Sequence, residues 1–188
     1  MTSGYAERAR RQGGFSLAEA LVAGAILTVS MIAGLSMILL GALANNRNKL
    51  DTSATLLAQN VQEVVQRAGA GSAAVLNITD CTGTVRNIGT AGAAGGGAGA
   101  PLTATGGVDF SAGPVGNYSM IYIVCRADGD PVSYDVRWNV INLRTVGTTV
   151  YVKQVTVAAR PIGAAVNSAN RLRDFALPVT LRGTTSQN

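Results

Sequence analysis

Residues 20–44 read ALVAGAILTVSMIAGLSMILLGALA and contain no charged side chain. A helix of these 25 residues, rising about 1.5 Å per residue, would be roughly 38 Å long, which exceeds the ~30 Å hydrocarbon core of a bilayer. A cleavable secretory signal has an apolar region of only about 7 to 15 residues. The stretch therefore predicts a transmembrane helix that acts as a single-pass anchor.

Basic residues flank this stretch on both sides. Arg8, Arg10 and Arg11 precede it, and Arg47 and Lys49 follow it. Because the cytoplasmic flanks of membrane helices carry an excess of Lys and Arg, the charges favour a cytoplasmic N-terminus, although by a small margin.

The composition excludes several classes of protein. The length of 188 residues predicts one domain, or one domain with an appendage. Apolar residues make up 47% of the chain and charged residues 13%, and the mean hydropathy is +0.26, which excludes a disordered charged tail and argues against an ordinary solvated enzyme. The chain has no histidine, so it lacks the commonest general base and imidazole metal ligand. We expect no enzymatic activity, no cofactor and no metal.

One carboxylate, Glu19, lies where the apolar stretch would enter the membrane. An ionised carboxylate costs roughly 2.5 to 3.5 kcal/mol at the centre of a bilayer and less near the interface, so such residues usually have a partner. No cation in the segment can serve as that partner. From the residues alone, Glu19 either lies solvated among the headgroups or pairs with a group from elsewhere.

Residues 10–19, RRQGGFSLAE, followed by the long apolar stretch, resemble the processing site of type IV prepilins. The resemblance implies that a prepilin peptidase cuts after Gly14, so that residues 1–14 are a leader peptide and Phe15 becomes an N-methylated N-terminus. It also implies that Glu19, the fifth mature residue, pairs with the α-amino group of a neighbouring subunit. A desolvated charge is tolerated when it is paired.

The resemblance implies a structural subunit of a filament rather than an enzyme. Position 18 is alanine where a larger aliphatic residue is common, and the apolar stretch has no proline, which favours a minor over a major pilin. The implied partners are the prepilin peptidase, the inner-membrane assembly machinery and other pilin subunits in a helical filament. The chain would sit in the bacterial inner membrane, with a cytoplasmic N-terminus and a periplasmic C-terminal domain, before it enters an extracellular pilus.

Two other functions remain open at this point. The chain could be a pseudopilin in the periplasmic pseudopilus of a type II secretion system, because the processing motif is shared. It could also be an adhesive or DNA-binding module that uses the helix only as an anchor. Six arginines lie scattered in the C-terminal part and could contact DNA phosphates or a surface ligand, but their spacing favours an ordinary solvated surface: Arg137, Arg144, Arg160, Arg171, Arg173 and Arg182.

The helical pattern continues beyond the membrane stretch. Apolar residues recur at alternating spacings of four and three, which is typical of an amphipathic helix that buries one face; they are Leu50, Ala54, Leu57, Val61, Val64 and Ala68. Gly69 and Gly71 follow where a C-cap is expected. We predict one helix over residues 15–68, roughly 81 Å long.

The C-terminal half changes to the period of a strand. Residues 132–140 alternate strictly between apolar and polar side chains, which predicts a half-buried antiparallel strand. Further strands are predicted over residues 118–125, 148–158 and 175–181. The expected fold class is α+β: a sheet over residues 117–188 packs as a meander on the apolar face of the helix, as in pilins.

Residues 69–116 are expected to connect the helix to this sheet. Within them, the segment 89–107 has eight glycines and six alanines among nineteen residues and no charge, which predicts a flexible surface loop. The two cysteines, Cys81 and Cys125, predict a disulfide in a domain that has crossed the membrane, worth about 4 kcal/mol at most in the chain-entropy model. Two unpaired buried thiols are the alternative.

Overall fold

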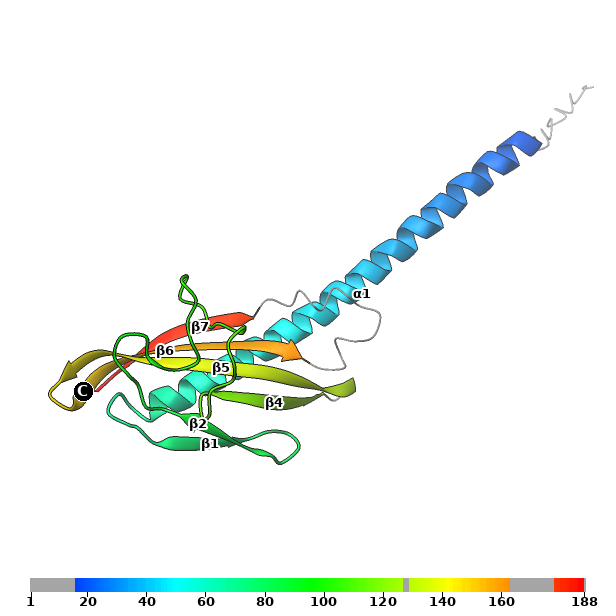
Figure 1. Ribbon diagram of the computed structural model, residues 1–188. Coiled ribbons are helices and arrows are strands. Elements are labelled where there is room, and N and C mark those ends of the chain that lie inside the picture. Colours follow the sequence, from blue (N-terminus) through cyan, green and yellow to red (C-terminus); the bar gives the residue numbers. More distant parts are fainter. Residues whose placement is uncertain (1–15, 127–128, 163–177, 188) are drawn as a thin grey trace, which may run out of the picture. The chain divides into compact units, whose positions relative to one another are not determined.

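The computed structural model describes residues 16–126, 129–162 and 178–187. The elements in chain order are α1 (Leu17–Arg67), β1 (Val75–Thr79), β2 (Val85–Gly89), β3 (Ala98–Gly99), β4 (Ser119–Arg126), β5 (Gly129–Val146), β6 (Thr149–Ile162) and β7 (Val179–Ser186). The predicted α+β fold, one long N-terminal helix with antiparallel sheets, is confirmed (Figure 1). Contacts divide the chain into two units, Met1–Asn45 and Asn46–Asn188, and the packing described below lies within the second.

Helix α1 ends where the glycines predict. Its last residue is Arg67, and Gly69 adopts a φ of 79°, a left-handed conformation that glycine reaches without steric cost. The Gly69 N–H donates to the carbonyl of Gln66 at 3.0 Å, and the Ala68 N–H to that of Val64 at 3.3 Å. The C-cap thus satisfies carbonyls that the last helical turn would leave without partners.

The buried face of α1 follows the predicted stripe and then shifts by one residue. Its buried residues are Leu50, Ala54, Leu57, Ala58, Val61 and Val65. Val64, predicted in the stripe, is only partly buried, and Val65 takes its place. The reason is geometric: with 3.6 residues per turn, Val65 lies closer than Val64 to the centre line set by Leu50, Ala54 and Val61.

The main sheet contains the predicted meander. Strands β4, β5, β6 and β7 pair in succession, all antiparallel, and β3 pairs with β5 beside β4. In the central register Trp138 of β5 faces Val157 of β6, which in turn faces Leu181 of β7. The last strand begins at Val179 rather than at the predicted residue 175, which lies outside the described residues.

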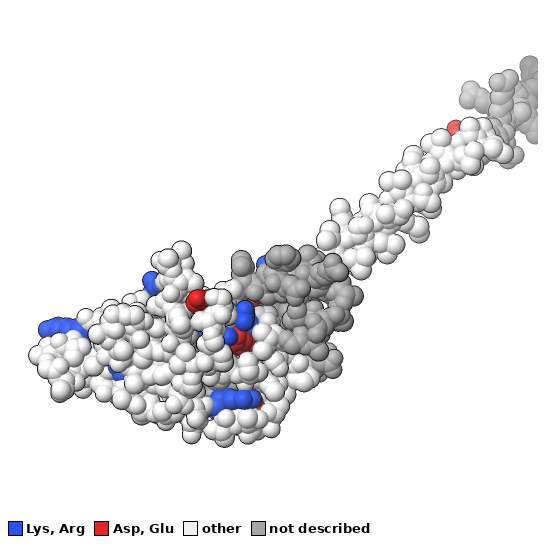
Figure 2. All heavy atoms as spheres, in the orientation of Figure 1, with Lys and Arg blue, Asp and Glu red and all other residues white. Residues whose placement is uncertain are grey.

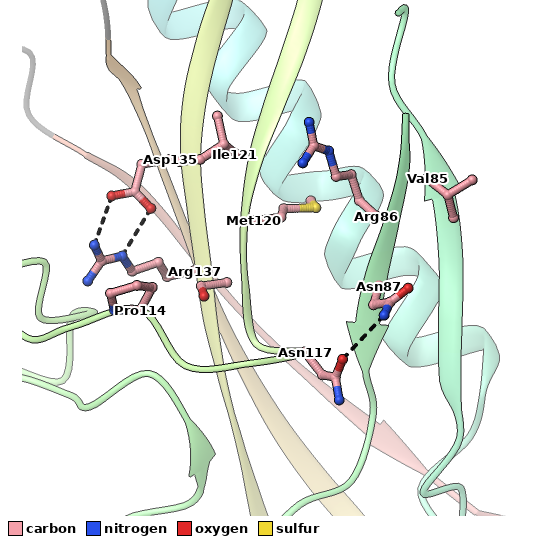
Figure 3. A pocket seen from close by; sticks show the side chains of 10 residues that line it. Val85, Arg86, Asn87, Pro114, Asn117, Met120, Ile121, Asp135 and Arg137 are labelled. Atoms are coloured by element: carbon pink, nitrogen blue, oxygen red, sulfur yellow. Dashed lines mark hydrogen bonds and ion pairs between the residues drawn. The ribbon is translucent and has the colours of Figure 1, made fainter. Parts of the chain in front are cut away.

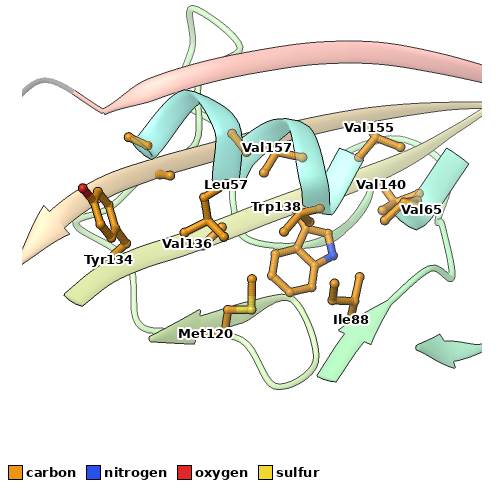
Figure 4. Packing of buried hydrophobic residues seen from close by; sticks show 14 of the residues in the cluster. Leu57, Val65, Ile88, Met120, Tyr134, Val136, Trp138, Val140, Val155 and Val157 are labelled. Atoms are coloured by element: carbon orange, nitrogen blue, oxygen red, sulfur yellow. The ribbon is translucent and has the colours of Figure 1, made fainter. Parts of the chain in front are cut away.

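One face of the sheet forms the core with α1. The predicted apolar side of β5 contributes Tyr134, Val136, Trp138 and Val140, each fully buried, and they pack with Leu57 and Val65 of the helix and with neighbouring strands (Figure 4). The two polar tips in this core are satisfied, as buried polar groups require. The indole N–H of Trp138 donates to the Gly89 carbonyl at 3.0 Å, and the Tyr134 hydroxyl to the Leu50 carbonyl at 3.3 Å.

The opposite face of β5 is buried too, so the prediction of a half-buried strand is wrong. Asp135, Arg137 and Asn139 are only 6%, 7% and 1% exposed. The cover comes from the chain between β2 and β4, whose Ala100 and Val108 form a small second cluster with Ala158 of β6. The alternation within residues 132–140 could not predict this, because the covering segment lies far away in the sequence.

The glycine- and alanine-rich segment supplies much of that cover, and the prediction of a flexible surface loop is wrong for it. β3 pairs Ala98 and Gly99 with Val140 and Asn139 of β5. The Ala100 N–H donates to the Trp138 carbonyl at 2.9 Å, and Ala100 is buried. The segment therefore lies against the main sheet, and its short strand β3 pairs with β5.

Its glycines are explained by close packing rather than by freedom of movement. A Cβ at Gly97 would collide with the side-chain oxygen of Asn139, and one at Gly99 with the Trp138 carbonyl. Both glycines also have a positive φ, 82° and 104°. Alanine or any larger residue would push this backbone away from β5.

Candidate functional site

The N-terminus of α1 carries a capping box. The Ser16 N–H donates to Glu19 Oε2 at 3.2 Å, and the Glu19 N–H donates to Ser16 Oγ at 3.2 Å. These reciprocal bonds satisfy two donors that a helix start leaves open. The sequence carries the signal for this box, Ser-x-x-Glu directly before an apolar helix, so backbone N–H groups as well as a cation are candidate partners for Glu19. Gly14 and Phe15 lie outside the described residues.

The apolar stretch that follows is uncovered on every side. All twelve Leu, Ile, Val and Met side chains between Leu21 and Leu40 are 59% to 75% exposed. Among the described residues, α1 is the one helix long and apolar enough to cross a membrane. Such a surface is unfavourable in water, and it makes this stretch a candidate membrane span by length and composition.

The predicted disulfide is confirmed, and the alternative of two free thiols is wrong. Cys81 and Cys125 are joined, with their Cα atoms 5.8 Å apart. Cys81 follows β1 and Cys125 lies in β4, so the bond attaches the β1–β2 hairpin to the main sheet. Two hydrogen bonds support the attachment: Tyr122 Oη donates to the Thr79 carbonyl at 3.0 Å, and the Cys81 N–H to the Ile123 carbonyl at 3.4 Å.

Asp80 orders the turn beside this disulfide. Its Oδ1 accepts the Thr82 hydroxyl at 2.6 Å and the N–H groups of Thr82 and Thr84 at 3.0 Å each, while Oδ2 accepts Arg86 Nη2 at 3.0 Å. Chiefly because of the Thr82 hydroxyl, and also of these other donors, the pKa of Asp80 falls to about 2. The turn is therefore fixed by a carboxylate that stays ionised at neutral pH.

The arginines do not form the evenly solvated set that the sequence predicts. Arg137 is buried and holds Asp135 with two parallel bonds of 3.0 Å, from Nε to Oδ1 and from Nη2 to Oδ2. Arg160 adds a third bond to Asp135, from Nη2 to Oδ2 at 3.1 Å. Both guanidinium groups lie over the ring of Phe110, 5.0 and 4.4 Å from its centre.

The other arginines are separated from this cluster. Arg144 lies over the ring of Tyr151, and Arg182 donates to the Gly106 carbonyl at 2.7 Å. On the face seen in Figure 2, basic side chains appear at separate places rather than as one patch. Arg171 and Arg173 lie outside the described residues. On that face, the basic side chains give no continuous track for a nucleic-acid backbone.

A groove of about 450 Å³ lies between β2 and β4 (Figure 3). Its lining mixes apolar and polar side chains from the hairpin, the sheet and the segment before β4: Val85, Arg86, Asn87, Pro114, Asn117, Ser119, Met120, Ile121, Asp135 and Arg137. Asn117, at one end, has a φ of 61°, which Asn tolerates better than most residues. Its side-chain oxygen accepts a long bond of 3.5 Å from Asn87 Nδ2.

Metal ligands do not gather in the part of the chain that the structure describes: it has no group of three or more His, Cys, Asp and Glu side chains placed to hold an ion. The acidic side chains described above are instead bound by arginines, hydroxyls and backbone N–H groups.

Comparisons with known proteins add no relative: no protein-family model, curated protein or solved structure matches this chain. The structure itself establishes a long N-terminal helix, apolar in its first half, whose last turns pack on a C-terminal antiparallel sheet. This is the arrangement of elements found in pilins.

Proposed function

We propose that this chain is a structural subunit, a minor pilin, of a type IV pilus or a related filament. The observation that carries the proposal is the start of α1. A prepilin-like processing sequence leads directly into a capped helix, and every large apolar side chain of the next two dozen residues is uncovered. A surface of this kind suits lipid before assembly and a bundle of identical helices after it.

Within such a filament, the first turn of α1 has two tasks. Ser16 and Glu19 close the helix end with backbone bonds, and the second oxygen of Glu19 stays available to the α-amino group of a neighbouring subunit. The positions of Gly24 and Gly34 are open, with no atom within 4 Å of an added Cβ. Such small residues allow apolar helices to approach closely.

The pathway is tested first on the protein from native membranes. Intact mass and N-terminal sequencing should give a chain that begins at N-methylated Phe15, and this form should be absent in cells without the prepilin peptidase. An uncut chain beginning near Met1 in peptidase-competent cells would reject the proposal. Surface-exposed filaments containing the chain would assign it to a pilus, and filaments confined to the periplasm to a pseudopilus.

The role of Glu19 is tested by variants that separate charge from capping. Glu19→Gln keeps a side chain that can accept the Ser16 N–H but removes the charge, because Gln also serves at this position of a capping box. Ser16→Ala removes the hydroxyl cap and keeps the charge. We expect both variants to be cleaved, Glu19→Gln to be lost from filaments, and Ser16→Ala to be incorporated. Incorporation of Glu19→Gln at the wild-type level would exclude charge pairing.

A further inference from the structure

The β1–β2 hairpin is held at its base by buried groups. Ile88, at the end of β2, and Thr90, which follows it, are fully buried. The Gly89 carbonyl accepts the indole N–H of Trp138 at 3.0 Å. The Thr90 N–H and hydroxyl both donate to the Ala74 carbonyl, at 3.1 and 2.7 Å. The base of the hairpin is therefore part of the core of the domain.

The tip of the same hairpin, residues 79–85, lies at the surface. Every residue of the tip except Asp80 is exposed. The disulfide between Cys81 and Cys125 attaches the tip to β4, together with the bonds from Tyr122 Oη to the Thr79 carbonyl and from Cys81 N–H to the Ile123 carbonyl. Each such hydrogen bond makes only a modest net contribution to stability, so the covalent bond is the strongest link at this end.

The turn within the tip is ordered by its own residues. Asp80 accepts hydrogen bonds from Thr82, Thr84 and Arg86, all of which belong to the hairpin. These bonds do not involve β4. The turn can therefore keep its shape when its link to β4 is cut.

The disulfide lies where a reagent in solution can reach it. Cys81 and Cys125 are both exposed, whereas the groups that hold the base of the hairpin are buried. Thiol–disulfide exchange requires a thiolate to reach one of the two sulfur atoms, so its rate depends on access. Exposure at both cysteines gives that access in the folded chain.

We propose that this disulfide is a redox-sensitive switch: a dithiol reduces it in the folded protein, and the tip of the hairpin then separates from β4 while the base stays in place. One thiolate of the dithiol attacks a sulfur of the Cys81–Cys125 bond, and the other cysteine leaves as a thiolate that takes up a proton. The second thiol of the reagent then attacks the mixed disulfide, which releases the first cysteine and leaves the reagent as its own disulfide. Two electrons and two protons thus pass from the dithiol to the two cysteines.

Separation of the tip uncovers apolar surface that the oxidised form covers. Ile78 of β1 packs against the core cluster. Met120 of β4 is only 7% exposed and lines the groove beside β2. The inference does not depend on the filament proposal, because it needs only that the domain meets a dithiol.

The first test asks whether reduction requires unfolding of the whole chain. The full chain in detergent micelles is treated with dithiothreitol at several urea concentrations below the unfolding transition, and free thiols are counted by alkylation and mass spectrometry. We expect the rate to change by less than about twofold across this range, since the folded chain itself reacts. Oxidised glutathione, treated in parallel, corrects for the effect of urea on the reagent. A rate that rises in parallel with the equilibrium constant for global unfolding would overturn the proposal.

The second test measures which part of the hairpin moves, by nuclear Overhauser contacts in the oxidised and the reduced protein. We expect reduction to abolish the contact between the Tyr122 ring and Thr79 at the tip and to leave the contact between the Trp138 indole N–H and Gly89 at the base. Loss of both contacts would mean that the hairpin unfolds as a whole. Retention of both would mean that the disulfide does not hold the tip. Either result would overturn the proposal.

Tyr122→Phe is the matched control. It removes the hydroxyl that donates to the Thr79 carbonyl but keeps the aromatic ring and the disulfide. In the oxidised variant we expect the contact between this ring and Thr79 to persist, and reduction to abolish it as in the wild type. Loss of the contact in the oxidised variant would assign the attachment of the tip to the hydrogen bond and contradict the role of the disulfide.

Discussion

The ammonium group of Lys153 donates to the Thr90 carbonyl at 2.9 Å inside the core, and it also donates to the Ser72 carbonyl. Lys153 lies on β6 and is 2% exposed. Ser72 follows the end of α1, and Thr90 follows β2. A single buried cation thus joins the sheet to the two connections that lead away from the helix and the hairpin.

This burial predicts an unusual pH dependence of stability. Loss of hydration lowers the pKa of Lys153 from its usual 10.5. Between the lowered pKa and 10.5, the unfolded chain binds more protons than the folded chain, so the free energy of unfolding rises with pH in that window. We expect this rise in the wild type and not in Lys153→Met. Denaturant unfolding followed by the fluorescence of Trp138, the only tryptophan, measures it.

Buried tyrosines have the opposite effect on the pH dependence of stability, so the measurement requires a control. Burial raises the pKa values of Tyr118 and Tyr134 above 10.0, so stability falls as the pH rises through that value in both proteins. Taking the difference between wild type and Lys153→Met at each pH removes this effect. A difference that does not change between neutral pH and the onset of tyrosine ionisation would contradict the prediction.

The lowered pKa of Asp80 predicts a second pH range, in acid, over which stability changes. Its pKa is about 2 in the folded chain and 3.8 when unperturbed, so its stabilising effect is complete above 3.8 and is lost as the pH falls toward 2. We expect the stability difference between wild type and Asp80→Asn to shrink across this window. Thr82→Val removes the hydroxyl but keeps the backbone donor. It should raise the pKa of Asp80 in the folded chain and so narrow the pH range over which the stability difference changes. An unchanged difference between pH 4.5 and 2 would exclude this role.

The buried carboxylate of Asp135 predicts that its replacement by an amide strongly lowers the free energy of unfolding. Asp135→Asn leaves Arg137 and Arg160 without their counter-charge, and we expect a loss of about 3 kcal/mol in the free energy of unfolding, typical of breaking a buried ion pair. The matched control is Asp51→Asn. It breaks an exposed pair with Arg47 at 3.9 Å and should cost no more than about 0.5 kcal/mol. Equal losses in the two variants would contradict the buried pairing.

Alanine substitutions at two glycines distinguish the cost of a steric collision from the cost of a left-handed backbone conformation. Gly95 and Gly97 both have a positive φ, 65° and 82°, so alanine meets a left-handed conformation at either position. An added Cβ would have no atom within 4 Å at Gly95 but would collide with Asn139 at Gly97. We expect Gly97→Ala to be less stable than Gly95→Ala by roughly 1 to 3 kcal/mol, the usual cost of overpacking. Thermal unfolding of both variants measures the difference.

The parts of the molecule that the sequence predicts are those set by local periodicity. The 3.6-residue pattern around Leu57 and the alternation around Trp138 identify the two faces that meet in the core, and the count of two cysteines indicates their pairing. The capping box at Ser16 was equally readable, because its signal lies within four residues.

The remaining features depend on neighbours that are distant in sequence. Asp135 and Arg137 have the pattern of a solvent face, and only the cover from the chain before β4 makes them a buried pair. The glycines near Gly97 have the composition of a linker, and only their contact with Asn139 shows why larger residues are excluded. Nothing around Lys153 in the sequence distinguishes it from a surface lysine on a strand.

The link between Cys81 and Cys125 also determines how the chain carries mechanical load. A pull applied between α1 and β5 passes through the sulfur atoms and bypasses the 44-residue separation between them. The bypassed loop contains β2, β3, the glycine-rich cover and most of β4, including both walls of the groove. Under tension, this whole layer is protected from extension for as long as the disulfide is intact.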